Sequence, residues 1–141
     1  MTEPVSKDLI EKLKNWKELD FHADRQLADE VLIADGWRVI PDEGFQGGFR
    51  WEFGTNPTYC SSEKSRPHVI HDLNTAIGVI PFGCNWRLTR IGDQFIAHVW
   101  KCGEIFRDEF EGHSTRETIA VLIAALRFKE SQTQVENGAG L

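Results

Sequence analysis

The chain has 141 residues, which is enough for one domain that buries its own apolar core without crosslinks. Its 22 acidic and 16 basic residues give a net charge of −6, which argues against a protein that coats nucleic acid or adheres to anionic membranes. This charge predicts no direct nucleic-acid partner. No stretch approaches the roughly 18 consecutive apolar residues of a spanning helix, so we also expect no membrane partner.

Two helices are predicted in the N-terminal part of the chain. Ser6 is a suitable cap for the first, whose apolar residues recur at helical spacing: Leu9, Ile10, Leu13 and Trp16. Asp20 is a suitable cap for the second, and Gly36 can end it in the left-handed conformation. We expect residues 1–20 to form a loosely packed N-terminal helix ahead of a single α+β domain at residues 21–130.

Two strands and a long loop are expected next. Residues 37–40 form a short strand that Pro41 ends, and residues 49–53 alternate bulky and polar side chains as a half-buried strand does. The glycine-rich stretch between them lacks the Lys-Ser/Thr ending of a phosphate-binding loop, so it predicts a bulged hairpin turn. Residues 54–71 show no periodicity, and a loop of this length is usually functional or mobile.

The second half carries clearer folding signals. Asp72 can cap a short helix, and residues 86–100 form a hairpin around the turn Gly92-Asp93. Apolar side chains occur on both faces of this hairpin, which predicts a sheet covered on both sides. Residues 104–111 are expected to add one more strand.

The last helix is predicted to begin with a capping box formed by Ser114 and Glu117. From Ile119 to Leu126 it is apolar almost all round, so it is either deeply buried or shared with a second subunit. We expect a homo-oligomer that associates through this helix. Residues 131–141 lack apolar anchors and are expected to form a disordered tail.

The order of these elements is similar to that of a known family. The segments that carry the similarity are Asp72-Leu73-Asn74-Thr75-Ala76-Ile77, Val79-Ile80-Pro81, Trp86, Phe95-Ile96-Ala97, Ile119-Ala120 and Ala124-Ala125-Leu126, with Gly36-Trp37-Arg38 after the second helix. This pattern resembles the phage ABA sandwich domain family of small phage and prophage proteins. The resemblance implies an α/β/α sandwich-like fold, in which helices cover an antiparallel β-sheet, and a phage or prophage origin. Its motifs form the fold and imply no activity.

The three cysteines, Cys60, Cys84 and Cys102, are odd in number and widely spaced. They indicate no disulfide framework and fit a reducing compartment. The first 17 residues also lack the apolar stretch of a secretory signal. We therefore expect the protein in the cytoplasm, which for a phage protein is the host bacterial cytosol.

The first candidate for a ligand site is the start of the last helix. A helix N-terminus presents free backbone N–H groups and the positive end of the helix dipole. Here it is joined by an imidazole, two hydroxyls and a guanidinium, from His113, Ser114, Thr115 and Arg116. These groups suit a phosphate, and Arg107 is predicted to assist them. The alternative is that Ser114 only caps the helix and that Arg116 is solvated.

The long loop supplies a second candidate. A nucleotide pocket needs an aromatic ring that stacks on a base, together with groups that bind ribose and phosphate. We predict this role for Trp51, Tyr59, Arg66 and His68, with His71 close by. The alternative is a solvated connection whose side chains do not converge.

Catalytic and metal-binding patterns are weak in this sequence. His68 and His71 are three residues apart, but no Cys-x2-Cys or His-Glu-x-x-His motif accompanies them. The chain also lacks a Gly-x-Ser-x-Gly elbow, and nothing around its cysteines would activate a thiol. We therefore expect no metal, no cofactor and no enzymatic activity.

These observations favour a phage anti-defence protein that binds and sequesters a nucleotide-derived immune signal, of the cyclic nucleotide or cyclic ADP-ribose type. The warrant is an analogy with phage sponge proteins of similar size and architecture. The alternative is an acidic inhibitor that binds a host defence protein or a nucleic-acid enzyme through unpaired acidic patches. Those patches are Asp29-Glu30, Asp42-Glu43, Asp108-Glu109 and Glu111.

Overall fold

Four helices and two small antiparallel sheets form the chain in the computed structural model, which describes residues 7–17, 20–45, 47–53, 59–62, 65–103 and 108–139. The side chains of residues 59, 60 and 133–139 are outside this description. The helices are α1 (Lys7–Lys14), α2 (Phe21–Asp35), α3 (Leu73–Ile77) and α4 (Glu117–Ala139). The strands are β1 (Arg38–Pro41), β2 (Phe49–Phe53), β3 (Tyr59–Ser62), β4 (Cys84–Ile91), β5 (Gln94–Lys101) and β6 (Phe110–Ser114).

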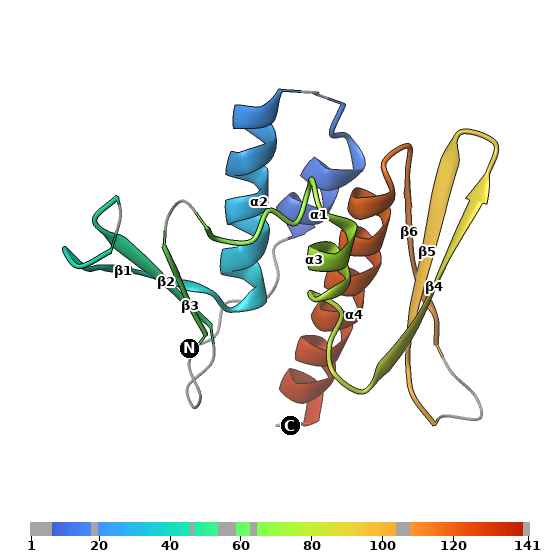
Figure 1. Ribbon diagram of the computed structural model, residues 1–141. Helices are drawn as coiled ribbons and strands as arrows, with labels where there is room; N and C mark the ends of the chain where they lie inside the picture. The colour runs from blue at the N-terminus through green and yellow to red at the C-terminus, as the bar shows by residue number, and fades with distance from the viewer. Residues whose placement is uncertain are drawn as a thin grey trace.

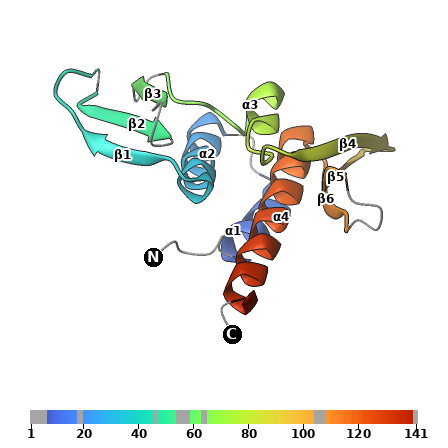
Figure 2. The same cartoon turned by 90° about the horizontal axis from the view of Figure 1, so that it is seen from below.

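The α+β class expected from the sequence is confirmed. One sheet has the order β1-β2-β3 and the other β4-β5-β6, and neighbouring strands in both are antiparallel. The helices lie between the two sheets (Figures 1 and 2), so the layers run sheet, helices, sheet. This order differs from the helix, sheet, helix arrangement that the resemblance implied.

Among the described residues, no helix lies on the outer face of the second sheet (Figures 1 and 2), where Ile91 is 62% exposed and side chains of the sheet itself cover Trp100. Arg87 on β4 lies opposite His98 on β5, and its guanidinium stands over the ring of Trp100 at 5.7 Å. Trp100 is only 9% exposed as a result. On the inner face, Ala97 and Val99 are buried against the helices. Apolar residues on both faces therefore did not imply helices on both faces.

The centre of the core is α4. Every side chain from Ile119 to Leu126 is 0% exposed within one chain, because α1, α3, β5 and β6 surround this helix. Of the two alternatives for the apolar stretch, the structure has the buried one. The stretch leaves no surface for a subunit contact. Association through this helix stays a prediction, but the apolar stretch no longer supports it, because the chain itself covers those side chains. No helix in the described ranges is both long and apolar enough to cross a membrane.

The N-terminal helix α1 belongs to the same core and is not loosely packed. Leu9, Ile10 and Leu13 are at most 8% exposed, and the helix packs against α4. Its expected cap, Ser6, lies outside the described residues. The predicted bounds of α2 are confirmed. At its N-terminal end, the side chain of Asp20 accepts the N–H of His22 at 3.2 Å, and at its C-terminal end Gly36 is left-handed, with φ of 113°.

The first sheet contains one strand more than expected. β1 and β2 form the predicted hairpin, with Val39 opposite Trp51. Within the segment expected to be a loop, β3 pairs with β2 and places Ser61 opposite Trp51, so the loop prediction is wrong for residues 59–62. The sequence did not predict β3 because a short, polar strand at the edge of a sheet need not alternate apolar and polar side chains.

The connection from α3 into the second sheet follows the sequence signals. The carboxylate of Asp72 accepts the N–H of Asn74 at 3.1 Å and the hydroxyl of Thr75 at 2.7 Å, as a helix cap does. The β4–β5 hairpin turns at Gly92-Asp93, with Ile91 opposite Gln94. Both predictions are confirmed.

The start and end of α4 differ from the sequence prediction. Ser114 ends β6, and its hydroxyl accepts the N–H of Arg116 at 3.1 Å in a local turn, so it does not form the expected capping box with Glu117. β6 covers residues 110–114 in place of 104–111, of which 104–107 lie outside the described residues. The backbone of α4 continues to Ala139, through most of the expected tail.

Gly112 sets the distance between β6 and α4. A Cβ atom at this position would lie 2.1 Å from the carbonyl oxygen of Ala120 and 2.7 Å from the nitrogen of Ala124. Both are helix backbone atoms, which cannot rotate aside. We predict that Gly112→Ala lowers the free energy of unfolding by about 2 kcal/mol or more, as measured by chemical denaturation.

The control for this prediction is Gly44→Ala. A Cβ there would meet only the side-chain oxygen of Asp42, at 3.2 Å, and the expected loss is below about 1 kcal/mol. A Gly112→Ala variant as stable as the control would show that the sheet can move away from α4 without cost.

Candidate functional site

A buried carboxylate, that of Asp24, is the point where the helices meet. Asp24 is 2% exposed. Arg116 donates to it through Nη1 at 3.1 Å and Nη2 at 3.0 Å. Trp16 donates through its indole N–H at 2.7 Å, and Nε2 of His71 lies 2.7 Å from the other carboxylate oxygen. Because an ionised carboxylate only accepts hydrogen bonds, Nε2 of His71 carries the proton.

The local structure explains why these four side chains converge. Asp24 lies in the first turn of α2 and points inward with the apolar stripe of that helix. Trp16 follows α1, His71 precedes the cap of α3, and Arg116 precedes α4. Each donor is therefore placed by the end of a different helix.

The hydrogen bonds at Asp24 overcome the cost of its burial. Burial alone would raise the pKa of this carboxyl group, but the hydrogen bonds from Arg116, Trp16 and His71 outweigh it and hold the pKa below its ordinary value. Asp24 is therefore ionised at neutral pH, and its charge is balanced by the guanidinium of Arg116.

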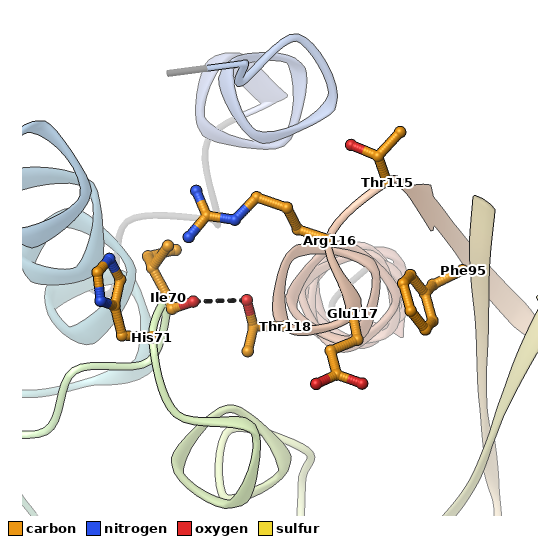
Figure 3. A pocket seen from close by; sticks show the side chains of 7 residues that line it. All are labelled: Ile70, His71, Phe95, Thr115, Arg116, Glu117 and Thr118. Carbon is orange, nitrogen blue, oxygen red and sulfur yellow. Dashed lines mark hydrogen bonds between the residues drawn. The ribbon is translucent and has the colours of Figure 1, made fainter. Parts of the chain in front are cut away.

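A hollow of about 410 Å³ opens beside this carboxylate, between the start of α4, the residues before α3, and β5. Its lining residues are Ile70, His71, Phe95, Thr115, Arg116, Glu117 and Thr118. Figure 3 shows a hydrogen bond between them, in which the hydroxyl of Thr118 donates to the carbonyl of Ile70 at 2.7 Å. His71 lies on one side of the hollow, and Phe95 and Glu117 lie on the other (Figure 3).

Arg66 and Trp51 belong to a different cluster. Arg66 donates to both oxygens of Asp29, at 2.8 Å and 3.0 Å, and stands over the ring of Trp51 at 5.3 Å. Arg25 donates to the same carboxylate at 2.9 Å and to the carbonyl of Pro67 at 2.8 Å. Trp51 is 3% exposed. These side chains join the first sheet to α2, and none of them lines the hollow.

His68 stacks on His71 at the edge of the site. The two ring centroids are 4.3 Å apart, and the edge of Phe21 packs on both rings. Neither ring nitrogen of His68 has a hydrogen-bond partner. Burial, together with the positive charge of Arg25, lowers the pKa of His68 to about 4. His68 is therefore neutral at pH 7 and serves as a packing ring.

The structure brings together only part of the predicted ligand site. Thr115 and Arg116 line the hollow, and Ser114 forms the turn that leads to them. His113 points to the outer face of the sheet, where its Nε2 lies 3.0 Å from Glu111. Tyr59 and Arg107 cannot be placed, because their side chains lie outside the described residues.

Sequence reasoning missed Asp24 and four residues that line the hollow: Ile70, Phe95, Glu117 and Thr118. Phe95 and Glu117 carried no signal beyond their strand and helix. Asp24 did carry one, because a carboxylate on the apolar stripe of α2, three residues before Leu27 and four before Ala28, indicates a buried charge that needs partners.

The acidic patches of the alternative function are mostly paired inside the fold. Asp42 pairs with Arg50, and Glu30 with Lys12. Glu109 lies 3.5 Å from Arg87. Four of these carboxylates, Asp29, Glu30, Asp42 and Glu109, thus already have cationic partners.

Glu111 differs from the other residues of these acidic patches in having imidazole partners. Its two oxygens contact His98 at 3.1 Å and His113 at 3.0 Å. The hydrogen bond from His113, followed by that from His98, holds the pKa of Glu111 below its ordinary value. Across the described part of the chain, no group of three or more His, Cys, Asp or Glu side chains is placed to hold a metal ion.

Comparison with protein-family models, with curated proteins and with solved structures finds no match to this chain. The resemblance to the phage ABA sandwich domain family therefore stays a prediction, and the site has to be interpreted from its own chemistry.

The first prediction from the site concerns Asp24. We expect Asp24→Asn to lower the free energy of unfolding by about 3 kcal/mol, because Arg116 would keep a partly buried charge without its counterion. Asp93→Asn, in the exposed hairpin turn, is the control, with an expected change below about 0.5 kcal/mol. Chemical denaturation at pH 7 measures both. Equal stability of the two variants would contradict the central role of this carboxylate.

The second prediction concerns pH. The pKa of His68 is about 4 in the folded chain and about 6.5 as its ordinary value, so between these pH values only the unfolded chain binds the proton. The free energy of unfolding should therefore fall as the pH drops from 6.5 to 4, by about 1 to 2 kcal/mol after allowance for solvent screening.

Denaturation curves across this pH range test the prediction with two variants. His68→Leu should remove most of this slope, whereas His22→Leu, at an exposed position of α2, should retain it. An unchanged slope in His68→Leu would show that another group is responsible.

Proposed function

We propose that this protein binds a small anionic ligand of nucleotide type in the hollow at the start of α4, and that it sequesters the ligand without converting it. The observation that supports this proposal is the composition of the hollow. It joins a helix N-terminus, a guanidinium, an imidazole, a hydroxyl and an aromatic ring around about 410 Å³, a volume within the usual range of small-molecule sites.

The first turn of α4 favours an anionic group. Glu117 and Thr118 are its first residues and line the hollow. The first backbone N–H groups of a helix have no partner within that helix, and the helix dipole adds a partial positive charge at this end. Phosphate oxygens are well suited to such a position.

Glu117 favours a ligand that also carries hydrogen-bond donors. Its carboxylate would repel a simple inorganic anion, but it can accept hydrogen bonds from ribose hydroxyls or from the amino group of a base. Phe95 offers an apolar wall for a sugar or base. Phosphate, hydroxyls and a ring occur together in nucleotides and cyclic nucleotides.

The same proposal covers the biological role. A phage or prophage protein that withdraws a cyclic nucleotide or a cyclic ADP-ribose in the host cytosol would blunt a defence response that depends on that signal. The support for this part is the sequence resemblance, together with the small size and α+β class of the chain. The proposal does not require an oligomer, because α4 is buried within one chain.

Calorimetry against a panel of nucleotides, cyclic nucleotides, cyclic dinucleotides and cyclic ADP-ribose isomers tests the proposal. We expect at least one member to bind with a dissociation constant near or below the micromolar range and to be recovered chemically intact. The absence of heat for every member, at protein concentrations well above micromolar, would refute it. Conversion of the ligand would instead contradict sequestration without catalysis.

A blocking variant tests the location. Thr115→Trp places a large ring at the exposed rim of the hollow and should weaken binding by about tenfold or more. Thr89→Trp, at an exposed position of β4 that faces away from α4, is the control and should bind like the wild type. Equal binding by both variants would place the ligand elsewhere.

A further inference from the structure

The arginine that lines the hollow does not supply a net positive charge for an anionic ligand. Arg116 is the cation in its lining, but both terminal nitrogens of its guanidinium donate to the buried carboxylate of Asp24. The formal charges of this pair cancel. Glu117 then adds a negative charge to the lining. An anionic ligand therefore needs another cation close to the hollow.

Arg90 on β4 is placed to supply it. It lies opposite Phe95 in the β4–β5 register, and its guanidinium carbon is 5.8 Å from the centre of the Phe95 ring. Phe95 is itself part of the lining. The Nε of Arg90 donates to the carbonyl of Gly92 at 3.2 Å, which ties the side chain to the hairpin turn. Among the residues that the structure describes, no carboxylate forms an ion pair with Arg90.

We infer that Arg90 is the principal phosphate-binding residue of this site, and that Arg116 is a positioning residue which holds the helix ends together. This inference rests on the proposed function and refines it. The ligand lies with its phosphate at the rim near Arg90 and Phe95. Its hydroxyl or amino donors face Glu117, in the first turn of α4.

The same strand offers a matched control residue. Arg87 is also exposed and also stands over an aromatic ring, that of Trp100, at 5.7 Å. It is three residues from Arg90, so its side chain projects from the opposite face of the sheet. Arg87 pairs with Glu109 at 3.5 Å. The two arginines therefore share charge, strand and exposure, but only Arg90 stands over a ring that lines the hollow, that of Phe95.

The experiment measures binding of ADP, with adenosine as its uncharged counterpart, to the full-length wild type and to Arg90→Gln and Arg87→Gln. We expect the Arg90 variant to bind ADP about tenfold or more weakly and adenosine within about twofold of the wild type. The Arg87 variant should bind both within about twofold. Arg90→Lys, which keeps the charge but not the planar fork, should recover part of the ADP affinity.

The outcomes separate this inference from the proposed function. If neither ADP nor any other member of the nucleotide panel binds the wild type, the proposed nucleotide site fails and the inference fails with it. If the wild type binds ADP and Arg90→Gln binds it equally well, the proposed function survives and the inference is overturned. An equal loss in the Arg90 and Arg87 variants would also overturn it, because net charge and not position would then explain the effect. Thermal denaturation of each variant excludes unfolding as the cause.

Discussion

The buried carboxylate of Asp24 is the interaction on which the arrangement of the helices depends. An ionised carboxylate in a protein interior is tolerated only when its charge is paired and its oxygens are hydrogen-bonded. Here the donors come from the end of α1, the residue before the α3 cap and the residue before α4. The helix ends are therefore coupled, and a hollow between them has a defined shape.

A second carboxylate on the same helix repeats this principle for the first sheet. Asp29 lies five residues after Asp24 and receives Arg25 and Arg66, and Arg66 covers the ring of Trp51. The first sheet is thus attached to α2 largely through charged side chains and one buried tryptophan. The second sheet is attached differently, by the close approach of Gly112 to α4. Polar contacts hold one side of the molecule, and close packing holds the other.

These contacts change how the charged residues should be interpreted as functional groups. An arginine at a helix start suggests an anion site, yet Arg116 is engaged by Asp24. The histidines of the loop are likewise committed, His71 to Asp24 and His68 to ring stacking. The groups that the hollow still offers to a ligand are the first turn of α4 and the acceptor Glu117, and the proposal adds Arg90, which stands over the ring of Phe95. Under the proposal, Arg116 keeps a structural role through Asp24, and the ligand-binding role falls to Arg90.

The sequence by itself determined the features that depend on a few adjacent residues: the Asp20 and Asp72 caps, the left-handed Gly36, the hairpin at Gly92-Asp93 and the α+β class. It also found Thr115 and Arg116 of the site. Only the tertiary structure decided three other features. These are the short edge strand β3, the placement of Phe95 and Glu117 in one hollow, and the pairing of Arg116 with Asp24, which lies 92 residues away in the sequence. The physical reason is range, because caps and turns act through neighbouring backbone groups, whereas ion pairs, edge pairing and cavities form between segments that only the folded chain brings together.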